Sequence, residues 1–250
     1  MTVQFPDVPQ LLKKHGLRPD KSLGQNFLID RAALQRVVDA AEIRSDETVF
    51  EIGTGLGSLT CLLATQARKV IAVELDSQLI PVLHEVLAPF ENISLIEGDI
   101  LKVNLAAILP PEPYLVVANI PYYITSAVIR YLLETRQPPR CLVLTIQREV
   151  AERICALPGD MSLLALSVQV YGQPQIAGRI PAGAFFPAPQ VDSAVVRVDL
   201  FSTPLIEQPD IDLFFLLAKA GFSQKRKTLR NSLSGGMHWA PEKTQIYLEE

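Results

Sequence analysis

Mainly apolar runs of four to six residues alternate along the chain with segments in which apolar residues recur every three or four positions. The runs predict buried strands and the periodic segments predict helices, such as one from Asp30, its expected N-cap, to Ala41. The predicted strands cover residues 48–52, 70–75, 93–96, 114–118 and 141–146. Regular alternation of strand and helix is typical of an α/β protein with a parallel sheet.

The pattern changes after residue 162. Two apolar segments, 163–171 and 193–200, are separated by proline and glycine, and they predict an antiparallel end to the sheet. After Pro204 the helical period returns. We therefore predict a main domain over residues 1–204, which includes an N-terminal arm over 1–45, and a small helical domain over 205–250.

The first predicted strand leads into a glycine-rich turn, Glu51-Ile-Gly-Thr-Gly-Leu-Gly-Ser58, and Ser58 is the expected N-cap of the helix that follows. Gly53 and Gly55 can adopt positive φ and let a ligand approach where a Cβ would collide. Glu74 ends the next strand, 21 residues after Gly53. An acid at that spacing usually accepts hydrogen bonds from ribose hydroxyls.

The ligand of this turn is better matched by S-adenosylmethionine than by NAD. Ser58 stands where the dinucleotide pattern needs a third glycine, and Glu51 would place a negative charge beside a pyrophosphate. A ribose, an adenine and a zwitterionic tail fit these residues. The alternative is a turn whose glycines serve only steric needs.

Asn119-Ile-Pro-Tyr122 follows the fourth strand and reaches the same edge of the sheet. The amine of adenine is a poor nucleophile, and two acceptors aimed at its N–H groups would orient its lone pair. Asn119 offers a side-chain oxygen, Pro121 fixes the local geometry next to a main-chain carbonyl, and Tyr122 offers a stacking face. The alternative is an ordinary Asn-x-Pro turn beside a packed tyrosine.

Two weaker candidates lie near this edge. Asp99 follows the third strand and could accept a hydrogen bond from an adenine amine, or cap a helix over 100–108. The segment Gln25-Asn-Phe-Leu28 could fold over the cofactor end of the glycine turn, or be a plain loop that leads into a helix.

Charge and composition narrow the function. The net charge is −4, but residues 11–36 carry six basic and two acidic side chains, and residues 219–230 carry five basic and none acidic. Two basic segments on an acidic body favour a polyanionic partner. Three scattered cysteines and three scattered histidines predict no metal site, and the sequence has neither a signal peptide nor a membrane span. We expect a cytoplasmic protein.

These motifs together resemble those of the ribosomal RNA adenine dimethyltransferases, bacterial small-subunit enzymes above all. The resemblance covers residues 21 to about 233 and rests on segments that occur in the family's order. They are QNFL, EIGTGLGSLT, EGD, NIPYYIT, FFPAPQVDSAVVR and FSQKRKTLRNSL. Thr54 stands where many members have proline, which should change only the rigidity of the turn.

The resemblance implies a Rossmann-like, seven-stranded S-adenosylmethionine-dependent methyltransferase sheet with a small C-terminal helical domain. It also implies dimethylation of N6 on two adjacent adenosines in the 3′-terminal stem-loop of small-subunit rRNA, within the pre-small ribosomal subunit. We expect a monomer, although no motif fixes the oligomeric state. The implied cofactor contacts are Asn26, Leu28, Gly53, Glu74, Asp99 and Asn119. Tyr122 and Phe185 match the residues that hold the target base, and Lys225, Arg226, Lys227 and Arg230 match an RNA-binding region.

Other functions stay open at this point. A large-subunit rRNA methyltransferase of the antibiotic-resistance type shares the glycine turn and the N-x-P-Y loop, although KSLGQNFL and KTLRNSL fit the small-subunit enzyme better. A ribosome-assembly factor could use the same basic surface without catalysis. A DNA adenine methyltransferase is disfavoured because the chain has no sizeable sequence-reading domain. The family's helical domain usually extends further, so we expect either a trimmed C-terminus or a short member.

Overall fold

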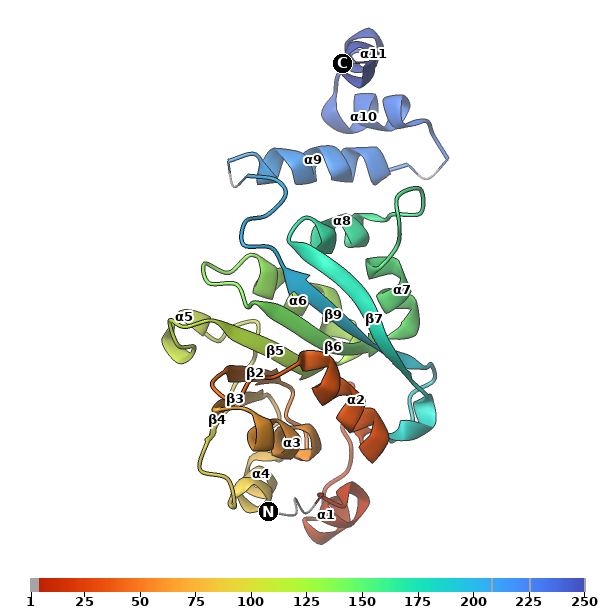
Figure 1. Ribbon diagram of the computed structural model, residues 1–250. Helices are drawn as coiled ribbons and strands as arrows, with labels where there is room; N and C mark the ends of the chain where they lie inside the picture. The colour runs from red at the N-terminus through yellow and green to blue at the C-terminus, as the bar shows by residue number, and fades with distance from the viewer. Residues whose placement is uncertain (1–4, 208, 225, 250) are drawn as a thin grey trace.

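The computed structural model describes residues 5–207, 209–224 and 226–249. In this part of the chain the central sheet has seven strands in the order β4-β3-β2-β5-β6-β9-β7, with helices on both faces (Figure 1). Strands β2 to β6 run parallel, and β9 is antiparallel to both β6 and β7. The strands are β2 (Thr48–Ile52), β3 (Lys69–Glu74), β4 (Ile93–Glu97), β5 (Tyr114–Asn119), β6 (Cys141–Gln147), β7 (Gly172–Ile180) and β9 (Ser193–Leu200). The predicted fold class is confirmed.

The helices fill the connections between the strands and form the C-terminal end. They are α1 (Val8–Lys14), α2 (Arg31–Ala41), α3 (Ser58–Gln66), α4 (Ile80–Leu87), α5 (Leu105–Ile108), α6 (Thr125–Leu133), α7 (Arg148–Ile154), α8 (Leu163–Gln169), α9 (Ile211–Phe222), α10 (Leu229–Met237) and α11 (Pro241–Glu249). Two short strands, β1 (Phe27–Leu28) and β8 (Phe185–Phe186), pair antiparallel outside the main sheet. None of the helices in the described residues is long and apolar enough to cross a membrane.

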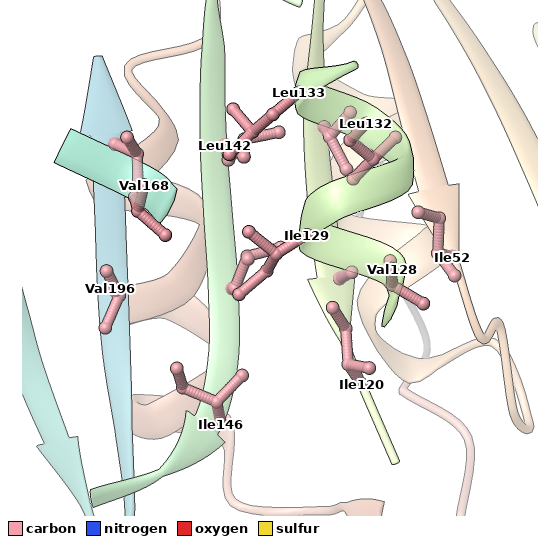
Figure 2. Close-up of a cluster of buried hydrophobic side chains, with 14 of the residues drawn as sticks. Ile52, Ile120, Val128, Ile129, Leu132, Leu133, Leu142, Ile146, Val168 and Val196 are labelled. Carbon is pink, nitrogen blue, oxygen red and sulfur yellow. The ribbon is translucent and has the colours of Figure 1, made fainter. Parts of the chain in front are cut away.

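The sheet is buried on both faces because alternate residues of each strand face opposite helix layers. In β2, Val49 packs against α2 and α3, whereas Phe50 and Ile52 pack against the layer of α6, α7 and α8. In the second layer Ile129 and Leu132 of α6 lie over β5 and β6 (Figure 2). The central strands are therefore packed between two layers of helices.

Two local predictions were wrong. The apolar segment 163–171 is not a strand, because the Ser162 side chain caps α8 by accepting from the Ala165 amide, 3.3 Å away. The antiparallel edge strand is instead β7, whose mostly exposed residues hide it from an apolar pattern. Ser58 is also not the N-cap of α3, since Gly57 takes that position at φ 83° and Ser58 is the first helical residue.

The C-terminal helices stack at the end of the molecule opposite α1 (Figure 1). Ile211 and Phe215 of α9 pack against the main core, and the Phe215 ring stacks on Tyr171 at 6.5 Å. α10 lies close against α9: a Cβ on Gly236 would come within 2.6 Å of the Ala220 Cβ. Whether residues 205–250 form a separate domain stays a prediction.

Candidate active site

The candidate site lies at the carboxyl edge of the parallel strands, where β2 has β3 on one side and β5 on the other. Connections leave β2 and β5 toward opposite halves of the sheet, so a crevice opens there, which is where ligands bind in open α/β sheets. The glycine turn begins at this edge, and the Gly53 amide donates to the Val73 carbonyl of β3, 2.9 Å away. The turn is thus held to the sheet.

The crevice contains a cleft of about 520 Å³. Most of the predicted site residues line it: Asn26, Gly53, Gly55, Glu74, Asn119, Pro121, Tyr122 and Phe185. Leu28 lines an adjoining hollow of about 330 Å³ that shares Gly53 and Asn119 with the cleft. The two hollows therefore meet at the start of the glycine turn and at the end of β5.

Asp99 lines neither hollow. Its carboxylate accepts from the Leu101 amide, 3.0 Å away, and forms an ion pair with Lys102, 3.2 Å away. Its loop is nevertheless next to the site, because the Gly98 amide donates to the Glu74 carbonyl at 2.8 Å. Contact between Asp99 and the cofactor stays a prediction.

The glycine turn needs its glycines for conformation and for space. Gly53 and Gly55 have φ of 75° and 58°, which side-chain-bearing residues rarely adopt. A Cβ on Gly55 would also come within 3.0 Å of the Phe27 ring, and one on Gly53 within 3.4 Å of the Asn119 carbonyl oxygen. The turn can therefore present main-chain atoms to a ligand.

Glu74 is held in place by main-chain donors. Its carboxylate accepts from the amides of Gly55 at 2.7 Å and of Leu75 and Asp76 at 2.9 Å. Burial raises the pKa of Glu74, and these three hydrogen bonds counteract that effect. The side chain is fixed as an acceptor facing the cleft, as a ribose diol requires.

Asn119 is oriented by the N-terminal arm. Its Nδ2 atom donates to the Asn26 carbonyl, 3.1 Å away, so Oδ1 is the side-chain atom left to accept a hydrogen bond. The Pro121 carbonyl accepts from the Ile124 amide at 3.2 Å, inside the turn that follows. Among the described residues no donor to the Ile120 carbonyl is found, so of the two carbonyls in the Ile120–Pro121 turn it is the one left to accept from a ligand.

The aromatic residues of the cleft differ in exposure. Tyr122 is half-buried, and its hydroxyl lies 2.8 Å from Ser193 Oγ. Burial raises its pKa, so the hydroxyl stays protonated at neutral pH. Phe185 is buried and pairs across β1·β8 with Leu28. Tyr122 therefore offers a face to the cleft, and Phe185 forms part of its wall.

Gln25 is a site residue that the sequence pattern did not single out by itself. Its Nε2 donates to Asp76 at 2.7 Å, and its Oε1 accepts from the Asp20 amide at 2.8 Å. These bonds fasten the N-terminal arm over the loop that carries Glu74. The position of Gln25 directly before Asn26 in the QNFL segment was the available signal.

The sequence profile of the family described as ribosomal RNA adenine dimethylase matches residues 16–249. The chain belongs to that family. A ribosomal RNA small subunit methyltransferase A from Dehalococcoides mccartyi is 45% identical over 91% of this chain and 79% of its own length. One from Geobacillus thermodenitrificans is 42% identical over 94% and 83%.

Two solved structures of rRNA or adenosine methyltransferases are also similar to this chain. A dimethyladenosine transferase from Plasmodium falciparum is 31% identical with a TM-score of 0.74, and it covers 83% of this chain and 74% of its own. The 23S rRNA methyltransferase ErmE is 32% identical with a TM-score of 0.72, over 83% of each chain. The protein is therefore an S-adenosylmethionine-dependent rRNA adenine dimethyltransferase.

The cleft residues fit S-adenosylmethionine. Glu74 offers a fixed carboxylate to the ribose, and the main chain of Gly53 and Gly55 can approach the ligand closely. Glu51, directly below the turn, is fully buried, and no hydrogen-bond partner of its oxygens is found among the described residues. Glu51 lines neither hollow, so the fit rests on Glu74 and the glycine turn. When bound, the cofactor supplies a methyl group activated by its sulfonium.

The predicted RNA-binding residues lie apart from the cleft. Arg226, Lys227 and Arg230 are exposed at the junction of α9 and α10, and none of them lines the cleft. Lys225 lies outside the described residues. Their contact with RNA stays a prediction.

Proposed function

We propose that the protein transfers two methyl groups to N6 of each of two adjacent adenosines in the 3′-terminal stem-loop of small-subunit rRNA. The modification would accompany assembly of the small subunit in the cytoplasm, with the enzyme acting as a monomer. The family establishes rRNA adenine dimethylation. The choice of subunit is supported by the names of its relatives and by the KTLRNSL segment.

The observation that carries the proposal is the orientation of Asn119. With Nδ2 bound to the Asn26 carbonyl, Asn119 Oδ1 and the Ile120 carbonyl are two acceptors at one edge of the cleft. Together they can accept hydrogen bonds from both N–H groups of an adenine amine and so direct its lone pair toward the methyl donor. The new N–C bond would form as the S–C bond of the methyl donor breaks, its electron pair staying on the donor's sulfur, and the amine would then lose a proton to water.

No general base is required for this attack. The chain contributes orientation and electrostatic complementarity, which can supply many kcal/mol in an enclosed site. Tyr122 adds a stacking face worth about 1–3 kcal/mol per base. An adenosine must leave its stack to reach Asn119, which suits a loop better than a duplex.

A methylation assay with tritiated S-adenosylmethionine tests the function directly. Undermethylated small subunits, undermethylated large subunits and the corresponding free rRNAs are offered separately, and the modified nucleosides are identified after digestion. We expect N6,N6-dimethyladenosine in small-subunit rRNA at two adjacent positions. If label appears only in the large subunit, the proposed small-subunit substrate is wrong. If only one position is modified, the proposed methylation of two adjacent adenosines is wrong.

The RNA-binding surface is tested by removing charge at the α9–α10 junction. We expect Arg226→Gln, Lys227→Gln and Arg230→Gln combined to weaken RNA binding and to lower the slope of log K against log salt by roughly 0.7–0.9 for each phosphate that is no longer neutralised. Binding is measured by filter retention at several salt concentrations. Arg68→Gln with Lys69→Gln, exposed at the start of β3, is the control. An unchanged slope in the triple variant would place the RNA elsewhere.

A further inference from the structure

We propose that Asp192 and Ser193 form a positioning pair that sets the gap between Tyr122 and Phe185, into which the target adenine enters. The proposal rests on the proposed function, which stacks the adenine on Tyr122, and on the family resemblance, which adds Phe185; both residues line the cleft. Neither residue touches the base in this scheme. Each fixes one of the two aromatic walls, and they are joined by a single peptide unit.

The first contact holds Tyr122. The Tyr122 hydroxyl lies 2.8 Å from Ser193 Oγ, and Ser193 is fully buried as the first residue of β9. The Ser193 backbone is paired on both sides, with Gln147 of β6 and Ile180 of β7. Because two neighbouring strands fix the serine, its hydroxyl is a rigid anchor, and the bond restricts the swing of the tyrosine ring above the cleft.

The second contact holds the segment that carries Phe185. The Ala182 amide donates to Asp192 Oδ1 at 3.0 Å, which closes the loop between these residues at its base. The Asp192 carbonyl accepts from the Arg148 amide at 3.0 Å, so the loop base is tied to the start of α7. Beyond Ala182, the chain continues directly into β8 and Phe185.

Both contacts determine the distance between the Tyr122 and Phe185 rings. Ser193 determines where the Tyr122 ring stands after β5, and Asp192 determines where the loop with Phe185 leaves β7. Methyl transfer needs the amine in line with the donor, and a misplacement of about 1 Å can lower the rate about 100-fold. The segment Val191-Asp192-Ser193, which leads into β9, therefore has a role in the reaction without contact to the substrate.

The test compares Ser193→Ala, Tyr122→Phe and the double variant of the full 250-residue chain. Each single change removes one hydroxyl of the same hydrogen bond, so we expect each to lower kcat on small subunits about 10-fold, and the double variant to be no worse than the singles. The affinity for S-adenosylhomocysteine, measured by calorimetry, should stay within 2-fold of wild type, roughly the scatter of such measurements. Ser167→Ala, whose hydroxyl bonds within α8, is the matched control and should leave kcat unchanged.

Asp192 is tested in the same assay. Asp192→Asn keeps the Oδ1 acceptor for the Ala182 amide, whereas Asp192→Ala removes it. We expect the asparagine variant to retain most of the wild-type kcat and the alanine variant to lose about 10-fold, because only the latter releases the loop base. Equal losses in both would show that charge matters rather than the hydrogen bond, and would overturn the role of Asp192.

Several outcomes would overturn the role of Ser193. They are a wild-type kcat in folded Ser193→Ala, additive losses in the double variant, or a loss explained by weaker S-adenosylhomocysteine binding. If Ser193→Ala does not fold, Tyr122→Phe decides alone, since it removes the same bond and keeps the stacking face: a wild-type kcat would overturn the role. A wild-type enzyme that makes no dimethyladenosine would instead overturn the proposed function.

Discussion

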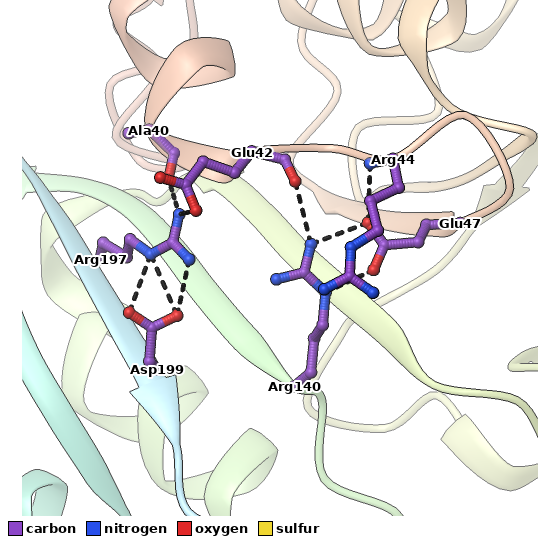
Figure 3. Close-up of polar contacts among 7 residues, drawn as sticks. All are labelled: Ala40, Glu42, Arg44, Glu47, Arg140, Arg197 and Asp199. Atoms are coloured by element: carbon purple, nitrogen blue, oxygen red, sulfur yellow. Dashed lines mark hydrogen bonds and ion pairs between the residues drawn. The ribbon is translucent and has the colours of Figure 1, made fainter.

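Both edges of the parallel sheet carry acidic side chains, but only the amino edge pairs them with arginines. At the amino edge, Arg140 pairs with Glu47, and Arg197 pairs bidentately with Asp199, with nitrogen–oxygen distances of 2.8–3.0 Å (Figure 3). Arg197 also bonds Glu42 at 2.9 Å. These pairs tie the loop after α2 to β6 and β9.

The carboxyl edge is the opposite case. Glu51 and Glu74 lie below and beside the glycine turn, and no arginine or lysine pairs with either among the described residues. Burial raises the pKa of Glu51 to about 8, and the nearby Glu74 charge adds to the shift. At the amino edge burial also acts on Glu47, but the hydrogen bonds from Arg140 and the Arg44 amide lower its pKa below the ordinary value.

The difference separates stability from function. At the amino edge the charged groups pair with one another, so none is left to bind a ligand. Unpaired carboxylates and main-chain acceptors at the carboxyl edge cost stability in the free protein, which is typical of a site preorganised for a ligand. Substitutions at the two edges should therefore change different observables.

The largest effect is expected from Asn119→Ala at the carboxyl edge. Loss of an acceptor that acts on the reacting amine should lower kcat at least about 100-fold, the size seen when a single oriented polar group is removed from an active site. RNA binding and the unfolding temperature should change little, because Asn119 contributes one hydrogen bond to the fold. Single-turnover methylation together with filter binding gives the result, and substantial turnover would remove Asn119 from the mechanism.

Glu51→Gln should produce a pH-dependent gain in stability. The folded state keeps a proton on Glu51 up to about pH 8, whereas an unfolded chain loses it near pH 4.5, so this residue lowers stability progressively as pH rises between those values. Glutamine cannot ionise, and the variant should gain on the order of 3 kcal/mol over wild type on going from pH 5 to pH 8. Urea unfolding at several pH values measures the difference.

Glu47→Gln is the matched control at the amino edge. The lowered pKa of Glu47 means that its ionised form stabilises the fold above about pH 4.5 and that this contribution is lost only on further acidification. The cost of Glu47→Gln should therefore be constant from pH 5 to pH 8. A flat difference for Glu51→Gln as well would show that Glu51 is ionised in the folded protein.

The sequence predicted the carboxyl edge better than the amino edge. Gly53, Glu74 and Asn119 follow three strands, and the ends of parallel strands necessarily meet at one edge, so local patterns were enough to bring them together. The contact of Tyr122 with Ser193 joins residues 71 positions apart. No periodicity encodes such a distant contact, so the positioning pair was invisible before the fold was known.

The inability of local patterns to encode distant contacts also explains the other differences between the predicted and the observed structure. The pairing of β1 with β8 joins the QNFL and FFPAP segments, which the sequence could only treat as separate motifs. The arginines of the amino edge looked like ordinary surface charges, since their partners lie on distant segments. α8 was taken for a strand because its apolar residues are nearly continuous, and only the capping bond of Ser162 separates the two structures.

The smallest effect is expected from Arg197→Met at the amino edge. Methionine keeps the apolar stem but loses the bonds to Asp199, Glu42 and the Ala40 carbonyl. Asp199 and Glu42 are about half and three-quarters exposed, so water can replace much of the lost interaction, and the free energy of unfolding should fall by only about 1 kcal/mol. Because these residues lie at the opposite edge of the sheet from Asn119, kcat should stay within about 2-fold of wild type. A large loss of kcat at unchanged stability would show that the two edges are coupled, and the division of the sheet into a stabilising and a reactive edge would be wrong.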